Sequence, residues 1–220
     1  MRIMNKRMGW NFLGLAFCAF GGLGLEFIYA FVLEPLVFGA QMGSWSTAES
    51  IVHWTLTGAT FGAVSAWLVW SAGKNYGLDI LSAREKVGTR QWAAVAALIA
   101  VSILMQYQDW GGFKTVLELE RLGTAKFVFQ YLYYGFETLL FLMIIVFGQK
   151  ACELWLGHEK IPYGGIICGL TWGLGHILSK GGLLIGLQGL LWGVMFGAAY
   201  LLVNRDIRKA WPVLFLMFVL

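Results

Sequence analysis

Six apolar segments, each about as long as a membrane-spanning helix, follow one another along the chain and are separated by short polar stretches. They are Trp10–Phe38, Ser50–Trp70, Gln91–Gln106, Thr124–Phe147, Ile161–Ser179 and Leu183–Val203. A helix needs about 20 apolar residues to cross a hydrocarbon core of roughly 30 Å. A seventh segment, Ala210–Leu220, is long enough to enter a membrane but short for crossing one. The pattern predicts an all-α, polytopic transmembrane bundle with six full spans, built as a single membrane-embedded domain over residues 1–220.

The composition indicates that the chain is embedded in a lipid bilayer, which is then its main partner. Hydrophobic residues make up 59% of the 220 residues and charged residues 13%, whereas a soluble domain has about 45–50% and 25%. These values exclude a disordered chain, and the three cysteines, with no CxxC pair, exclude a disulfide scaffold. The net charge of +4 is spread over several loops, which argues against nucleic acid as a partner.

The distribution of lysine and arginine predicts the orientation. The N-terminal segment and the loops after the second, fourth and sixth spans hold 12 of the 16 basic residues. Cytoplasmic loops carry an excess of such residues. We therefore expect a multi-pass protein of the cell membrane with a cytoplasmic N-terminus.

Two further patterns concern helix packing. The outer loop Asp109–Gly123 alternates charged and apolar residues and is typical of an interfacial amphipathic helix. Along the sixth span, glycines recur three or four residues apart, at Gly182, Gly186, Gly189, Gly193 and Gly197. This spacing predicts a smooth strip against which another helix packs closely.

Four ionisable residues lie at membrane depth: Glu26, His53, Glu137 and His176. Such residues cost at least about 2.5–3.5 kcal/mol at the bilayer centre on insertion scales, so they usually have a partner or a function. Counting residues along each span places all four in the outer half of the membrane, where they can line one cavity. Glu34 lies near an outer end and is expected to be hydrated.

These four residues are compatible with several kinds of site. A glutamate in a water-poor cavity can act as a general base on a water molecule, and a nearby histidine can orient that water or polarise a carbonyl. Imidazole and carboxylate groups are also zinc ligands, so Glu26, His53, Glu137 and His176 are alternative candidates for a metal site. The third alternative is a structural pair, which we favour for Glu26 and His53 because no motif surrounds them.

The stretch Gly169–His176 contains an aromatic residue four positions before a histidine, here Trp172 and His176. This stretch resembles the second motif of the CAAX-protease and bacteriocin-processing family of intramembrane glutamic proteases, and the resemblance covers the C-terminal half of the chain. One span earlier, Glu137 falls where the family carries its glutamate motif. Further matches are Gly193–Tyr200 and the pair Trp211-Pro212.

The resemblance implies an endopeptidase in which Glu137 activates water, His176 assists it and Trp172 contributes to substrate binding, with no cofactor required. Glu26 and His53 are further candidate substrate-binding residues, chosen only for their depth. The chain departs from the family pattern at three positions. Phe136 replaces the first glutamate, Phe141 replaces the arginine, and Met217 stands where a third-motif histidine is expected.

Three functions are consistent with this sequence. The first is an intramembrane endopeptidase that cleaves a membrane-associated peptide, or a catalytically silent relative of such an enzyme. The second is a transport or binding subunit for a small molecule, which a polar cavity between short helices would suit. The third is a component of a membrane complex that binds a protein partner through its glycine strips.

Overall fold

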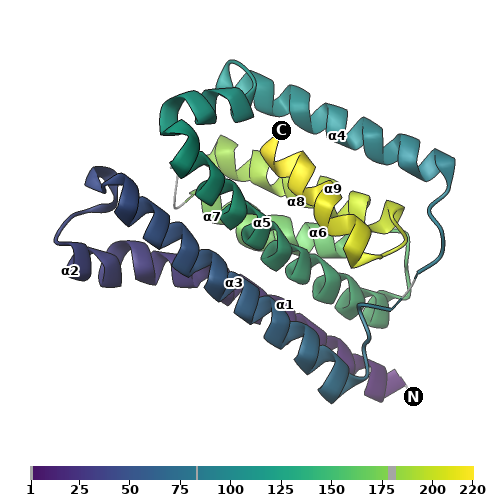
Figure 1. Ribbon diagram of the computed structural model, residues 1–220. Helices are drawn as coiled ribbons and strands as arrows, with labels where there is room; N and C mark the ends of the chain where they lie inside the picture. The colour runs from purple at the N-terminus through teal and green to yellow at the C-terminus, as the bar shows by residue number, and fades with distance from the viewer. Residues whose placement is uncertain (1, 83, 178–181) are drawn as a thin grey trace.

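The computed structural model describes residues 2–82, 84–177 and 182–220, and every element within these ranges is a helix (Figure 1). The elements, in chain order, are α1 (Arg2–Ile28), the π-helix η1 (Tyr29–Leu33), α2 (Glu34–Phe38), the 3₁₀-helix η2 (Met42–Ser44), α3 (Thr47–Tyr76), α4 (Thr89–Trp110), α5 (Lys114–Leu156), α6 (Tyr163–Cys168), the π-helix η3 (Gly169–Gly173), α7 (Leu174–His176), α8 (Leu183–Leu202) and α9 (Ile207–Val219). The all-helical class predicted from the sequence is confirmed for the described residues.

Four helical segments in the described ranges are long and apolar enough to cross a membrane: Lys6–Phe38, Thr89–Trp110, Lys114–Leu156 and Leu183–Leu202. The count of six spans is therefore not confirmed. The predicted span Ser50–Trp70 lies within α3, whose buried face carries Ser50, His53, Thr57 and Ser65 and is correspondingly polar. The predicted span Ile161–Ser179 is divided among α6, η3 and α7, and its last two residues lie outside the described ranges.

Helix α5 forms the centre of the bundle. Its residues from Leu140 to Gln149 are buried without interruption, which is expected of a helix that has neighbours on all sides. Helices α1 and α3 pack against α5 on one side, and α6 and α9 contact it on the other (Figure 1). The short C-terminal helix α9 buries Val213, Leu214 and Met217.

The glycine strip of α8 packs against the backbone of the preceding helical segment. A Cβ atom added to Gly193 would meet backbone atoms of Gly169 and Gly165, and one added to Gly189 would meet backbone atoms of Gly173. The predicted role in close helix packing is therefore confirmed for Gly186, Gly189, Gly193 and Gly197, whereas a Cβ atom at Gly182 would meet only Ile185 of α8 itself. The contact fixes α6, η3 and α7 on α8 and so positions Trp172 and His176 (Figure 1).

The segment predicted as an amphipathic helix forms the first part of α5. Gly123 has φ 72° and ψ 163°, so the backbone bends there and residues 114–122 form a helix of their own before the long one. Glu118 is 1% exposed and accepts hydrogen bonds from Gln130, Tyr131 and Tyr134, each at 3.0 Å. Lys114 donates to the backbone oxygen of Phe218 at 2.8 Å. These polar contacts hold the segment against the bundle.

We expect Glu118→Ala to destabilise the protein, because it takes the shared acceptor from one buried and two half-buried donors. Each orphaned group costs roughly 1–3 kcal/mol. Glu120→Ala is the matched control, since Glu120 lies two residues further along the same helix and is exposed. Thermal unfolding in detergent measures the difference. Equal melting temperatures for the two variants would contradict the anchoring role of Glu118.

The segments that hold most of the basic residues lie at one end of the bundle. The indole N–H of Trp155, near the end of α5, donates to the backbone oxygen of Lys6 at 3.1 Å. Arg84, Lys150 and Arg205, which come from three different loops or helix ends, line one pocket. The common side predicted for these segments therefore corresponds to a common end in space.

We predict that this end faces the cytoplasm. A cysteine introduced at Arg84, which is exposed, should then be protected from a membrane-impermeant thiol reagent in intact cells and react once the membrane is opened, because the basic loops lie inside. A cysteine at Glu120 is the complementary control for the opposite end. Labelling of the Arg84 position in intact cells would reverse the assigned orientation.

Candidate functional site

Trp172 joins the two residues that the sequence singled out for catalysis. Its indole Nε1 donates to Oε1 of Glu137 across a distance of 3.4 Å. Its backbone oxygen accepts from Nδ1 of His176 at 2.9 Å, and its ring lies 4.7 Å from the imidazole in an edge-to-face arrangement. All three side chains are half-buried. The structure therefore places Glu137 and His176 in contact with the same residue, Trp172.

The contact between Trp172 and His176 determines the tautomer of the imidazole. A carbonyl oxygen only accepts hydrogen bonds, so Nδ1 carries the proton in this contact. In a neutral imidazole Nε2 is then an acceptor, which suits holding a water molecule. Polarising a carbonyl oxygen through Nε2 requires the protonated ring.

A π-helix carries Trp172 into this position. Residues Gly169–Gly173 form the wider turn η3, between α6 and α7. Gly169 and Gly173 within it are buried against α8. Their contact with α8 holds the η3 backbone in place and so sets the direction in which the Trp172 side chain points. Single π-helical turns within α-helices often occur at functional sites.

Aromatic and apolar side chains surround Trp172 at the positions where the resemblance predicts polar ones. Phe141, at the expected arginine position, is fully buried, and its ring lies 5.1 Å from that of Trp172. Met217, at the expected histidine position, is also fully buried. The neighbouring Phe218 lies 6.0 Å from Trp172, ring to ring. Polar chemistry near Trp172 therefore rests on Glu137 and His176.

The pair Trp211-Pro212, a further match to the family pattern, lies on a helix that also reaches this site. The indole of Trp211 on α9 donates to the backbone oxygen of Gly135, two residues before Glu137, at 2.9 Å. Helix α9 is thereby fixed on α5, and its end brings Phe218 to Trp172. Residues from α5, η3 and α9 thus converge at the site, although they are distant in the sequence.

His53 belongs to a second polar cluster, which is formed by α1, α2 and the beginning of α3. Its Nδ1 lies 2.7 Å from Oε2 of Glu34, and its Nε2 lies 3.7 Å from Oε1 of Glu26. The hydroxyl of Tyr133 donates to Glu26 at 2.8 Å. Tyr133 stands one helical turn before Glu137 on α5, so it connects this cluster with the first.

The expectation that Glu34 is hydrated was wrong. Glu34 is 4% exposed and His53 is 1% exposed. Because the chain changes from η1 to α2 at Glu34 and then turns back through η2 to α3, the carboxylate is covered by its own hairpin. A small cavity of about 160 Å³ borders His53 and is lined also by Trp45 and Trp54.

No group of three or more histidine, cysteine, aspartate or glutamate residues that could hold a metal ion occurs in the described ranges. The zinc alternative drawn from Glu26, His53, Glu137 and His176 therefore lacks an assembled set of ligands there. Glu26 and His53 lie together with Glu34, whereas Glu137 and His176 meet at Trp172.

Comparisons with protein-family models, with curated proteins and with solved structures found no match to this chain.

Proposed function

We propose that this chain is a multi-pass protein of the cell membrane that hydrolyses a membrane-associated peptide, with Glu137 as the general base. The observation that carries the proposal is the contact of one residue, Trp172, with both Glu137 and His176. Peptide hydrolysis by this route needs a general base and a group that orients the water, and Glu137 and His176 are the residues suited to these two roles. The lipid bilayer is the partner that the four long apolar helices support.

The proposed reaction uses only this chain and water. The Glu137 carboxylate takes a proton from a water molecule, whose oxygen attacks the carbonyl carbon of the scissile bond. His176 orients the water through Nε2. The tetrahedral intermediate then breaks its C–N bond, and the protonated Glu137 returns the proton to the departing amine. The products are a new carboxyl terminus and a new amino terminus.

A second candidate function is peptide binding without hydrolysis. The observation that favours it is the burial of Phe141 and Met217 at the two positions where the resemblance predicts an arginine and a histidine. Without these polar groups, the oxyanion has fewer donors, and one missing donor costs about 100- to 1,000-fold in rate. The aromatic side chains around Trp172 would still suit contact with a hydrophobic peptide.

The test uses the purified full-length protein in lipid nanodiscs with a pool of apolar peptides. Mass spectrometry identifies the cleaved peptides, and co-purification identifies those that are retained. We expect cleavage by the wild type and none by Glu137→Gln. Unchanged cleavage by the variant would refute the role of Glu137. Retention of peptides by both proteins without cleavage would establish the binding function instead.

A further inference from the structure

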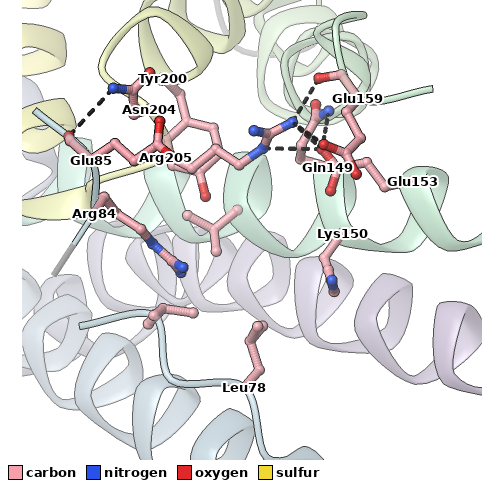
Figure 2. Close-up of a pocket in the computed structure, with 12 residues that line it drawn as sticks. Leu78, Arg84, Glu85, Gln149, Lys150, Glu153, Glu159, Tyr200, Asn204 and Arg205 are labelled. Atoms are coloured by element: carbon pink, nitrogen blue, oxygen red, sulfur yellow. Dashed lines mark hydrogen bonds and ion pairs between the residues drawn. The ribbon is translucent and has the colours of Figure 1, made fainter. Parts of the chain in front are cut away.

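A polar pocket of about 450 Å³ lies at the end of the bundle where the basic segments meet, away from Glu137 (Figure 2). It is bounded by the ends of α5 and α8 and by the two loops that follow α3 and α5. Its lining consists of Leu78, Ile80, Arg84, Glu85, Val146, Gln149, Lys150, Glu153, Glu159, Tyr200, Asn204 and Arg205. The mechanism proposed above uses none of these residues.

One of the three basic side chains in the pocket is engaged by acidic neighbours. Arg205 binds Oε1 of Glu153 through Nε at 3.1 Å and through Nη2 at 2.8 Å, and it also donates to the backbone oxygen of Glu159 at 2.7 Å. Gln149 donates to the same Glu153 oxygen at 2.9 Å. Nη2 of Arg205 also lies 3.9 Å from Oε2 of Glu159, so two carboxylates flank this one guanidinium and it offers no net positive charge to a ligand.

The other two basic side chains are not balanced in this way. Within the described ranges, Arg84 and Lys150 form no ion pair, and Arg84 donates only to the backbone oxygen of Asp79, at 3.3 Å. In Figure 2 both side chains lie below the Arg205–Glu153 pair, Arg84 to the left and Lys150 to the right, on the same helix as Glu153. Tyr200, which is 5% exposed, also borders the pocket. Arg84 and Lys150 are thus the two basic side chains of this lining whose charge is available to an anion.

We propose that this pocket binds a phosphate group, held by Arg84 and Lys150. The guanidinium fork of arginine matches the geometry of phosphate oxygens, and lysine adds a compact charge. Glu85, which also lines the pocket, opposes an anion and places the phosphate nearer Lys150. Basic pockets between helix ends at a membrane surface suit the headgroups of anionic lipids. The phosphate of a soluble phosphorylated compound has the same chemistry.

The experiment measures saturable binding of short-chain phosphatidic acid to the full-length protein in detergent, by native mass spectrometry. Inorganic phosphate is the soluble competitor, and phosphatidylcholine is the zwitterionic comparison. We expect Arg84→Gln and Lys150→Gln each to weaken binding about tenfold, because each removes a charge-assisted contact. Lys160→Gln, a change of the same charge at an exposed residue outside the pocket, should alter binding less than about twofold.

Glu85→Gln gives a result that misfolding cannot imitate, since removal of the opposing charge should tighten binding. Competition by inorganic phosphate would identify a soluble source for the ligand, and its absence would identify the lipid headgroup. Either result, together with losses confined to Arg84 and Lys150, supports the site. Failure of phosphatidic acid to bind saturably, or an equal loss in Lys160→Gln, would overturn it.

Discussion

Gly193→Ala is expected to be among the most damaging single substitutions in this protein. The added Cβ atom would overlap backbone atoms of Gly169 and Gly165, and a backbone cannot move aside as a flexible side chain can. Helices α8 and α6–η3 would have to separate. Overpacking of this kind typically costs about 1–3 kcal/mol, and more where backbone meets backbone. Because η3 carries Trp172, the change should also displace the indole from Glu137.

The matched control is Gly21→Ala on α1. A Cβ atom there would meet nothing within 4 Å, and alanine is favoured over glycine in a helix by roughly 1 kcal/mol. We expect a clear loss of thermal stability for Gly193→Ala and an unchanged or slightly higher stability for Gly21→Ala. Indistinguishable melting temperatures would show that the glycine contact does not hold α8 against η3.

Glu137→Gln is expected to reduce peptide hydrolysis by about 100- to 10,000-fold, the usual contribution of a general base. The amide has nearly the shape of the carboxylate, and its oxygen can still accept from the Trp172 indole. It cannot take a proton from water, so the loss should appear in the chemical step while the melting temperature changes little. Steady-state kinetics and thermal unfolding of the same preparations separate these effects.

Two further variants test whether the loss of activity is specific to Glu137. His176→Ala should lower the rate by a smaller or comparable factor, because it removes the group that orients water. Glu26→Gln should be mild, since Glu26 contacts Tyr133 and His53 rather than Trp172. If Glu26→Gln were as inactive as Glu137→Gln, the catalytic base would have to be sought in the cluster of Glu26, Glu34 and His53.

The part of the site that is local in sequence was predictable. Trp172 and His176 stand four residues apart, so a helical repeat places them on one face. That Glu137 shares a site with them followed from the similar depth of the two residues in their spans. Other contacts join segments that are distant in the sequence, such as those of Phe141 and Phe218 with Trp172. They depend on how each helix is rotated about its own axis, and the depth of a residue in its span does not determine that rotation.

Buried carboxylates were the least predictable feature. Glu34 and Glu118 lie near helix ends, where a carboxylate is usually hydrated. Each becomes buried because a turn in the backbone covers it, at η2 for Glu34 and at Gly123 for Glu118. The donors that stabilise Glu118 come from Gln130, Tyr131 and Tyr134. The close run of tyrosines at 131, 133 and 134 was a signal for polar partners at this depth.

Spans were predictable where apolar residues make up most of a helix. Residues Leu183–Leu202 appear as a long apolar helix at nearly the predicted bounds. Helix α3 is longer, but it turns serine, threonine and histidine toward the core. It is therefore long enough to cross a membrane but does not qualify as a span by its hydropathy. Backbone-to-backbone packing at η3 similarly interrupts the regular helix predicted over residues 161–179.

The most direct test of the central claim is the fate of oxygen from water during cleavage. A peptide from the cleaved pool is incubated with the wild type and with Glu137→Gln in water enriched in ¹⁸O, and the fragments are weighed by mass spectrometry. Hydrolysis by water activated at Glu137 predicts one ¹⁸O atom in the new carboxyl terminus with the wild type and no product with the variant. Labelled product formed equally by both proteins, or unlabelled product from the wild type, would contradict the proposed mechanism.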